Sequence, residues 1–294
     1  MFGGLEAGGT KFVCVIGSGP DDIRVSERIA VTTPAETIPA AIAFFRRALD
    51  SDTGLSAIGI GSFGPVELRP THPAYGHITT TPKPGWSNTD LVGPFRDAFG
   101  LPIGFDTDVN AAVLAEARWG AARGLRDVVY LTIGTGVGGG ALVDGRVVHG
   151  LGHPEMGHIA VDRHPDDDYP GHCPFHGACL EGMASGPALE ARFGRRAETL
   201  TDRDRERAVE LAAHYLADGV RSLTYVVAPE RVVVGGGVGM MPGLIERARE
   251  LLTAQLGGYP GLPEHGSDGY LVAAALGGMA GPAGALLLAQ SAKG

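Results

Sequence analysis

The sequence predicts an α/β protein. Short apolar runs typical of buried strands alternate with amphipathic helical patterns through most of the 294 residues, and this alternation is typical of the α/β class. The 47 glycines lie in discrete turns between apolar runs, which indicates many tight turns or loops that approach a ligand closely. With 44% apolar residues, the chain is long enough to bury a sizeable core.

The first part of the chain is expected to hold strands and helices in alternation. Thr37 is expected to open the first helix, with Pro39 near its start. The expected elements are a buried strand 12–17, a more exposed strand 24–33, a helix 37–50, a buried strand 57–66 and a helix near 90–100.

The remainder continues the alternation. Asp144-Gly145 is a strong signal for a tight hairpin. The expected elements are a strand 102–108, a helix 110–122, strands on either side of a glycine turn over 127–150, helices 187–194 and 205–227, a strand that ends in glycines over 231–239 and a helix 241–256.

Charge and cysteine content exclude several classes of protein. A formal net charge of −9 argues against general nucleic-acid binding, which needs clustered positive charge. The apolar stretch 273–290 is broken by Gly and Pro, so no membrane span is expected, and no secretory signal is evident at the N-terminus. Three cysteines do not form a disulfide framework, and a cytoplasmic location is expected.

Three strand ends run into glycines, at 6–11 (EAGGTK), 131–140 (LTIGTGVGGG) and 232–239 (VVVGGGVG). The second matches the spacing of the dinucleotide fingerprint, but that fingerprint needs a following helix and an alternating strand pattern follows here. The first lacks the residue order of a P-loop. Hairpins with glycine tips remain, whose bare N–H groups can approach phosphates. Glycines that only form tight turns are the alternative.

FDTDVN presents two acidic side chains where a strand meets a helix. Asp106 or Asp108 could serve as a catalytic base. An aspartate just before a helical pattern is also an ordinary helix cap. The residues alone leave both interpretations of Asp108 open.

The stretch 173–179, CPFHGAC, has the C-x2-H-x2-C spacing of zinc chelate pairs. Zinc, a surface cluster without structure and a disulfide are the three possibilities, with zinc favoured. From spacing alone, the fourth ligand could be any of several neighbouring histidines: His153, His158, His164 or His172.

The order of these motifs over nearly the whole chain resembles the ROK family of sugar kinases, in the superfamily of sugar kinases, hexokinases and actin. The resemblance implies a two-lobed, actin-like (ribonuclease H-like) α/β fold with ATP and sugar in the interdomain cleft. It places a smaller lobe at 1–107, completed by a C-terminal helix at about 280–294. A larger lobe with the zinc-binding loop follows at 108–279.

The resemblance also assigns the nucleotide site. EAGGTK is similar to the first phosphate loop, IGTGVGGG to the second, and VVVGGGVG to the adenosine segment. Glu6 stands where the family usually has Asp, and it is expected to help hold the catalytic Mg²⁺. The implied ATP-binding residues are Glu6, Gly8, Gly9, Thr10, Lys11, Gly134, Thr135, Gly136, Gly138, Gly235, Gly236 and Gly237.

The D-x-N-A-A signature of the family falls on Asp108 and Asn110, which implies that Asp108 is the catalytic base and Asn110 supports it. Thr107 replaces the usual Asn, and Asp106 is expected to be structural. Trp86 could shape the pocket wall or belong to the core. The residues implied to bind sugar are Gly64, Pro65, Lys83, Trp86, Asp108, Asn110, Glu155, His158 and Glu181.

The E-x-G-H pattern of the family selects the histidine at 158 as the fourth metal ligand. The implied ligands of a structural Zn²⁺ are His158, Cys173, His176 and Cys179. The family usually has C-x-C-G-x2-G-C here, and the histidine in the middle resembles the fructokinase branch. Four protein ligands leave no open position for a catalytic water.

Glu6, TPKPGW and CPFHGAC together resemble the fructokinase branch of the family, which implies ATP-dependent phosphorylation of D-fructose to fructose 6-phosphate. Glucose, mannose or an N-acyl-hexosamine is the alternative substrate. Two further functions are alternatives. A non-catalytic sugar-sensing regulator of this family would carry a helix-turn-helix module before the first glycine loop. A zinc hydrolase would need a metal with three protein ligands and a bound water. The expected partners are sugar and nucleotide, without nucleic acid or membrane, and a homodimer is expected.

Overall fold

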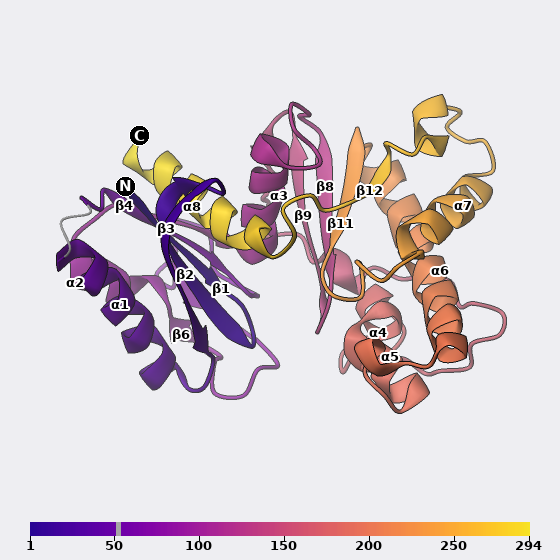
Figure 1. Cartoon of the computed structure of the whole chain (residues 1–294), viewed down its shortest axis with the longest axis horizontal. Coiled ribbons are helices and arrows are strands. Elements are labelled where there is room, and N and C mark those ends of the chain that lie inside the picture. The colour runs from indigo at the N-terminus through magenta and orange to yellow at the C-terminus, as the bar shows by residue number, and fades with distance from the viewer. Residues whose placement is uncertain (51–53) are drawn as a thin grey trace. The chain divides into compact units, whose positions relative to one another are not determined.

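The computed structural model describes residues 1–50 and 54–294 (Figure 1). The chain forms two compact units. The first unit comprises Met1–Trp119, Val147–Pro154 and Gly278–Gly294, and the second comprises Gly120–Arg146 and Glu155–Gly277. The expected lobe boundary after residue 107 lies where a strand meets the helix that begins at Asp108, and this helix groups with the first unit.

The first unit is built on a five-stranded sheet in the order β3-β2-β1-β4-β7. β1 pairs antiparallel with β2 and parallel with β4, and β4 is parallel to β7. Its strands are β1 (Phe2–Ala7), β2 (Lys11–Gly19), β3 (Asp22–Ala30), β4 (Ala57–Ser62) and β7 (Ile103–Thr107), with a small ladder of β5 (His77–Ile78) and β6 (Thr89–Asp90). Its helices are α1 (Pro34–Asp50), α2 (Val92–Phe99), α3 (Asp108–Trp119) and α8 (Ala280–Lys293).

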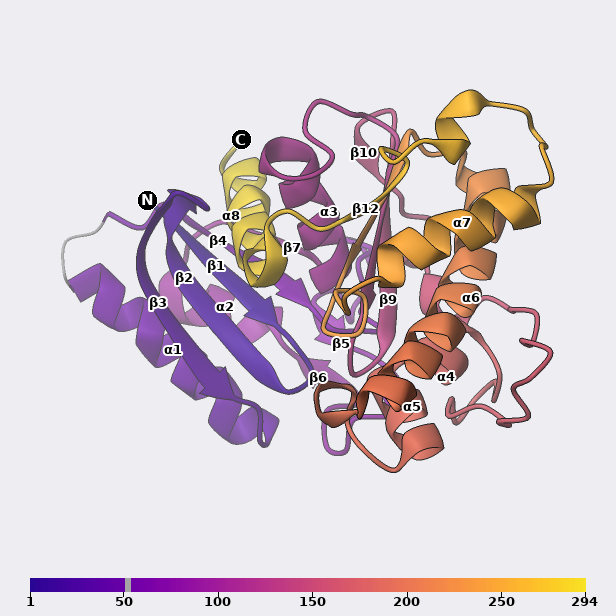
Figure 2. The same cartoon turned by 45° about the vertical axis from the view of Figure 1, so that its right-hand side comes forward.

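A row of glycines crosses one face of this sheet. Gly4, Gly59 and Gly104 are direct neighbours on β1, β4 and β7. A Cβ at Gly59 would lie 1.8 Å from the backbone oxygen of Ala285, and one at Gly104 would lie 2.1 Å from that of Leu288. α8 therefore rests directly on the strands, and Figure 2 shows it against them. These glycines serve helix packing, a use that the expectation of turns and ligand loops did not include.

The opposite face of the sheet carries the larger core of the first unit. Leu5, Ile58 and Ile60 alternate with the glycine row and pack with aromatic side chains of α1 and α2. Phe45 makes edge contacts with Phe95, at a ring-centroid distance of 6.1 Å. The two faces of one sheet thus bury their apolar area in different ways.

The second unit is built on a sheet in the order β10-β9-β8-β11-β12. β8 and β9 form an antiparallel hairpin, and β11 is parallel to both β8 and β12. Its strands are β8 (Val128–Ile133), β9 (Val137–Val143), β10 (Arg146–Val147), β11 (Arg231–Gly235) and β12 (Leu271–Ala273). Its helices are α4 (Leu180–Ala184), α5 (Gly186–Phe193), α6 (Asp202–Val227) and α7 (Leu244–Leu256).

The expected alternation of strands and helices is confirmed, with differences at particular ends. The first helix begins at Pro34 and contains Pro39, so the expected start at Thr37 is wrong. The Thr37 hydroxyl instead accepts a hydrogen bond from the Thr32 N–H at 3.1 Å. Asp144 and Gly145 have φ of 52° and 73°, as the expected tight hairpin requires. β12 and α4 were not expected, and both are short.

Among residues 1–50 and 54–294, no helix combines the length and the apolar character that crossing a membrane requires.

Candidate functional site

The first glycine turn is the tip of the β1–β2 hairpin. The Gly8 N–H donates to the Lys11 carbonyl at 3.0 Å, and the side chains of Thr10 and Lys11 are exposed. Glu6, at the end of β1, is in register with Gly61 of β4, which is in register with Asp106 of β7. Residues that are in register on neighbouring strands point to the same face of the sheet. The carboxylates of Glu6 and Asp106 therefore both lie on the face that α8 covers.

Burial, followed by the charge of Asp108, raises the pKa of Glu6 from 4.5 to about 7. The folded protein therefore disfavours the ionised form of this carboxyl group. Gly61 explains how Asp108 comes near, since a Cβ at Gly61 would lie 3.4 Å from the Asp108 Cα. The carboxylates of Glu6 and Asp108 are thus close enough to interact electrostatically. They provide oxygen ligands of the kind that Mg²⁺ prefers.

The raised pKa of Glu6 predicts an effect on stability. Since the folded state binds a proton that the unfolded state releases, stability should fall as the pH rises from about 4.5 to about 7. In protein free of metal and nucleotide, Glu6→Gln should therefore increase the free energy of unfolding more at pH 8 than at pH 5. Urea unfolding at both pH values measures this, with Glu198→Gln, at an exposed glutamate, as the control. An equal effect of Glu6→Gln at the two pH values would contradict the prediction.

The junction of β7 and α3 contains a buried hydrogen-bond network. Asp106 is 4% exposed, and its Oδ1 accepts from the Thr107 N–H and from the Asn110 Nδ2, both at 2.7 Å. The Thr107 Oγ1 accepts from the Asn110 N–H at 3.1 Å, so Thr107 caps α3. The Asp108 Oδ1 accepts a hydrogen bond from the adjacent Val109 N–H at 2.9 Å. The sequence allowed Asp108 to be the N-cap of this helix, and the structure places Thr107 in that role.

Asn110 is fully buried, and among the described residues its Oδ1 has no hydrogen-bond partner. The bond from its Nδ2 to Asp106 fixes which end of the amide is the oxygen. The unpaired acceptor suits a ligand hydroxyl.

His149 belongs to the same network and was not singled out from the sequence. Its Nε2 lies 2.9 Å from the Asp106 Oδ2, and the hydrogen bond that the imidazole donates to this carboxylate raises the pKa of the imidazole. Its neighbour His153 accepts the Val66 N–H on Nε2 at 3.0 Å. These two contacts attach residues 147–154 to the first unit. The available signal was the pair of histidines in HGLGH, just before the E-x-G-H pattern.

The other expected sugar residues of the first unit occupy different settings. Gly64 and Pro65 follow β4 in a partly exposed loop, and a Cβ at Gly64 would lie 3.2 Å from the His153 ring. Lys83 is partly exposed. Trp86 is fully buried, its Nε1 donates to the Thr32 carbonyl at 3.0 Å, and its ring packs on Phe12. Of the two interpretations that the sequence allowed for Trp86, pocket wall or core, the structure shows the core position. Trp86 therefore lines no open surface.

In the second unit, two of the glycine runs come together. Gly134–Gly136 join β8 to β9, and a Cβ at Gly134 would lie 4.0 Å from the Gly237 N. Gly236 has φ of 84°, and its Cβ would lie 2.3 Å from the Ile133 carbonyl oxygen. Thr135 and Gly237 are exposed. The two glycine runs therefore meet at the ends of the parallel strands β8 and β11, and Gly138 lies within β9.

A hollow of about 190 Å³ adjoins the third glycine run. It is lined by the segment that joins β11 to α7, by residues of α7 itself and by one residue of β12: Gly239, Met240, Met241, Pro242, Gly243, Ile245, Glu246, Arg249 and Ala273. Two methionines and an arginine offer apolar and stacking contacts to a flat ring.

Glu181 is attached to the second glycine turn. Its Oε2 accepts the Val137 N–H at 3.0 Å and would lie 2.7 Å from a Cβ at Gly136. An added side chain at Gly136 would therefore disturb Glu181 as well as the turn. Glu155 is exposed, and its carbonyl accepts the His158 N–H at 3.0 Å.

The four expected metal ligands gather at one point. The Cys173 Sγ lies 3.7 Å from the Nδ1 of both His158 and His176, and the Cys179 Sγ lies 3.6 Å from the His158 Nδ1. All four ligand atoms lie within 4.8 Å of one another. Ligands about 2.0–2.3 Å from a tetrahedral ion would be about 3.3–3.8 Å apart, so the arrangement fits one small ion.

The backbone holds this cluster without a disulfide, because all three cysteines are free. Cys173 and Gly177 exchange backbone hydrogen bonds of 3.3 and 2.9 Å, and Cys179 is the N-cap of α4. Burial raises the pKa of the Cys179 thiol to about 11, so a bound cation would be needed to stabilise its thiolate. His164 and His172 lie outside the cluster: the Asp166 N–H donates to the His164 ring and Tyr169 contacts that of His172.

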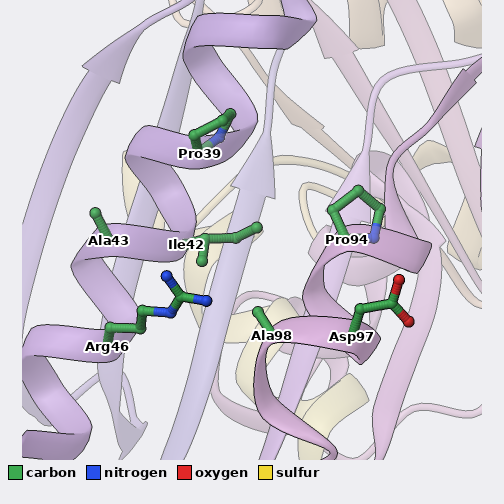
Figure 3. A pocket seen from close by; sticks show the side chains of 7 residues that line it. All are labelled: Pro39, Ile42, Ala43, Arg46, Pro94, Asp97 and Ala98. Carbon is green, nitrogen blue, oxygen red and sulfur yellow. The ribbon is translucent and has the colours of Figure 1, made fainter.

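A second hollow, of about 330 Å³, lies between α1 and α2 (Figure 3) and contains none of the expected site residues. It is lined by Pro39, Ile42, Ala43, Arg46, Pro94, Asp97 and Ala98.

The match to a family of known proteins identifies the class of protein to which this chain belongs. The profile of the ROK family matches residues 2–292, and the chain belongs to this family. The crystal structure of a ROK hexokinase from Thermus thermophilus is 30% identical, covers 99% of this chain and 98% of its own, and superposes with a TM-score of 0.78. The expected actin-like fold is thereby confirmed.

Two individual relatives of this chain are sugar kinases with different named sugars. A fructokinase from Zymomonas mobilis is 43% identical over 297 residues, covering 100% of this chain and 97% of its own. A ROK family glucokinase from Streptomyces griseus, solved with glucose and AMPPNP, is 25% identical, covers 99% of each chain and has a TM-score of 0.74.

Proposed function

We propose that this protein is an ATP-dependent fructokinase, which transfers the γ-phosphoryl group of ATP to the 6-hydroxyl of D-fructose. The observation that carries the proposal is the 43% identity to a fructokinase along the whole chain, against 25% to a glucokinase of the same family. The Asp108 carboxylate, on the first residue of α3 directly after the parallel strand β7, provides the base that this reaction needs.

In this proposal Asp108 accepts the proton of the attacking hydroxyl. Thr107 caps α3 and Asp106 holds the Asn110 amide, so the geometry around Asp108 is set by its neighbours. The unpaired Asn110 Oδ1 accepts a hydrogen bond from a sugar hydroxyl. The remaining proposed sugar contacts are Gly64, Pro65, Lys83, Glu155, His158 and Glu181.

The nucleotide is proposed to bind to exposed backbone of the glycine runs. Gly8, Gly9, Thr10 and Lys11 form one phosphate loop, and Gly134, Thr135, Gly136 and Gly138 form the other. Gly235–Gly237 and the hollow of about 190 Å³ beside them suit the adenosine moiety. Mg²⁺, held with help from Glu6, would neutralise charge on the phosphates.

His158, Cys173, His176 and Cys179 are proposed to hold a structural Zn²⁺, since thiolate and imidazole ligands favour zinc over magnesium. Four protein ligands close the coordination sphere. The ion would then stabilise the loop that joins Glu155 to Glu181, and a hydrolytic water would have no position on it. A homodimer and a cytoplasmic location stay predictions.

The substrate is tested with purified protein, MgATP and a panel of fructose, glucose, mannose and N-acetylmannosamine. We expect the highest kcat/KM with fructose, and phosphorus NMR should place the phosphate on the 6-oxygen. A higher kcat/KM with glucose or N-acetylmannosamine would contradict the substrate and leave the kinase reaction standing. The absence of phosphorylation with every sugar would overturn the proposed function.

A further inference from the structure

We infer that Gly281 is a positioning residue for Glu6: its missing side chain makes the space in which the Glu6 carboxylate lies. The inference deepens the proposed function, because it concerns the carboxylate expected to help hold Mg²⁺ at the nucleotide.

The contact between the two residues is close. A Cβ at Gly281 would lie 2.2 Å from the Glu6 Oε1, 2.5 Å from its Cδ and 2.9 Å from its Cγ. Gly281 is the second residue of α8, so the backbone of the first turn of α8 lies directly against the Glu6 carboxyl group. An alanine would fit the helical backbone itself, since alanine is the best helix former.

Withdrawal of α8 would relieve the clash only at the cost of its close packing elsewhere, whereas the end of the Glu6 side chain is flexible. Further along the helix, the backbone at Ala285 and Leu288 already touches the glycine row of the sheet at Gly59 and Gly104. On its other side α8 meets α3, where a Cβ at Gly284 would lie 1.8 Å from the Ala111 carbonyl oxygen. The flexible end of Glu6 is therefore the part that must move.

The displacement would be about 1 Å, since an ordinary non-bonded contact is about 3.5 Å. A misplacement of this size near the reacting groups can lower a rate by about 10²-fold. Glu6 carries one methylene more than the aspartate usual at this position in the family. Glu6→Asp withdraws the carboxylate by about one carbon–carbon bond, roughly 1.5 Å. The shorter acid should therefore tolerate a methyl group at position 281.

The experiment is a double-mutant cycle of Gly281→Ala, Glu6→Asp and the double variant. Gly278→Ala is the matched control, because a Cβ at this nearby glycine meets nothing within 4 Å. For each purified protein we would measure kcat/KM for ATP with fructose, the affinity for AMPPNP with and without Mg²⁺ by calorimetry, and the thermal midpoint.

We expect Gly281→Ala to lose about 10- to 10²-fold in kcat/KM for ATP and to lose Mg²⁺-dependent AMPPNP affinity, with the control unchanged. In the Gly281→Ala background, Glu6→Asp should recover most of both losses. Wild-type values in Gly281→Ala, or a double variant no better than Gly281→Ala, would overturn the inference. If Gly281→Ala fails to fold, the double variant decides: a folded double variant supports the steric coupling, and an unfolded one overturns it. Inactive wild-type protein would instead refute the proposed function, and the AMPPNP cycle would still test the coupling.

Discussion

Asp108→Asn is expected to lower kcat by at least about 10²–10⁴-fold, the usual range for loss of a general base. The amide keeps the size of the side chain and an oxygen for the Val109 N–H, but it cannot accept the proton of the sugar hydroxyl. Thr107 caps α3 and Asp106 organises Asn110 independently of this carboxylate, so the fold should persist. Steady-state kinetics with fructose and MgATP measure the loss, and calorimetry should find AMPPNP binding retained.

Asp90→Asn is a matched control for Asp108→Asn. Asp90 also precedes a helix, and its Oδ1 accepts the Gly93 N–H at 2.7 Å, a bond that asparagine can keep. Its kcat should stay near the wild-type value. An Asp108→Asn protein that retains most of its kcat would place the base elsewhere.

Cys179→Ser is expected to abolish metal binding. Elemental analysis should find one zinc per chain in the wild type and none in the variant, since two thiolates and two imidazoles hold the ion and serine is a poor zinc ligand. Structural zinc contributes on the order of 10 kcal/mol to small metal-dependent folds. Its loss should therefore loosen the loop between Glu155 and Glu181 and raise KM for sugar more than KM for ATP.

Cys14→Ala is the control for Cys179→Ser, because Cys14 is a buried thiol of β2 outside the cluster. It should retain the zinc. Full zinc content in Cys179→Ser would contradict the ligand set. Normal sugar binding by chelated, metal-free wild type would contradict the role in holding the loop while leaving the metal site itself in place.

The fold could be predicted where local pattern decides it. The Asp144-Gly145 hairpin follows from residues that accept positive φ, and the strand after IGTG excludes a dinucleotide fold. Local pattern could not show that Gly4, Gly59 and Gly104 form one row, because their alignment depends on strand register. The start of α1 at Pro34 was missed because Thr37 resembled a cap and bonds to Thr32 instead.

The residues of the candidate site likewise include some that the sequence could predict and some that it could not. The spacing of Cys173, His176 and Cys179 predicted a chelating loop, and the structure brings His158 to it. His149 was missed because its partner Asp106 lies 43 residues away, and a lone histidine in a loop has no periodicity. The sequence could not show that Thr107 and not Asp108 caps α3, because the two residues are adjacent and only the backbone geometry distinguishes them.

The position of α8 has a consequence for biosynthesis. The sheet that α8 covers is made from the first strands of the chain, whereas α8 is synthesised after every strand and helix of the second unit. On the ribosome, the second unit can therefore complete its core before the first, whose glycine row has no helix packed on it until α8 emerges. A chain cut off before α8 would leave this row without the helix that packs on it.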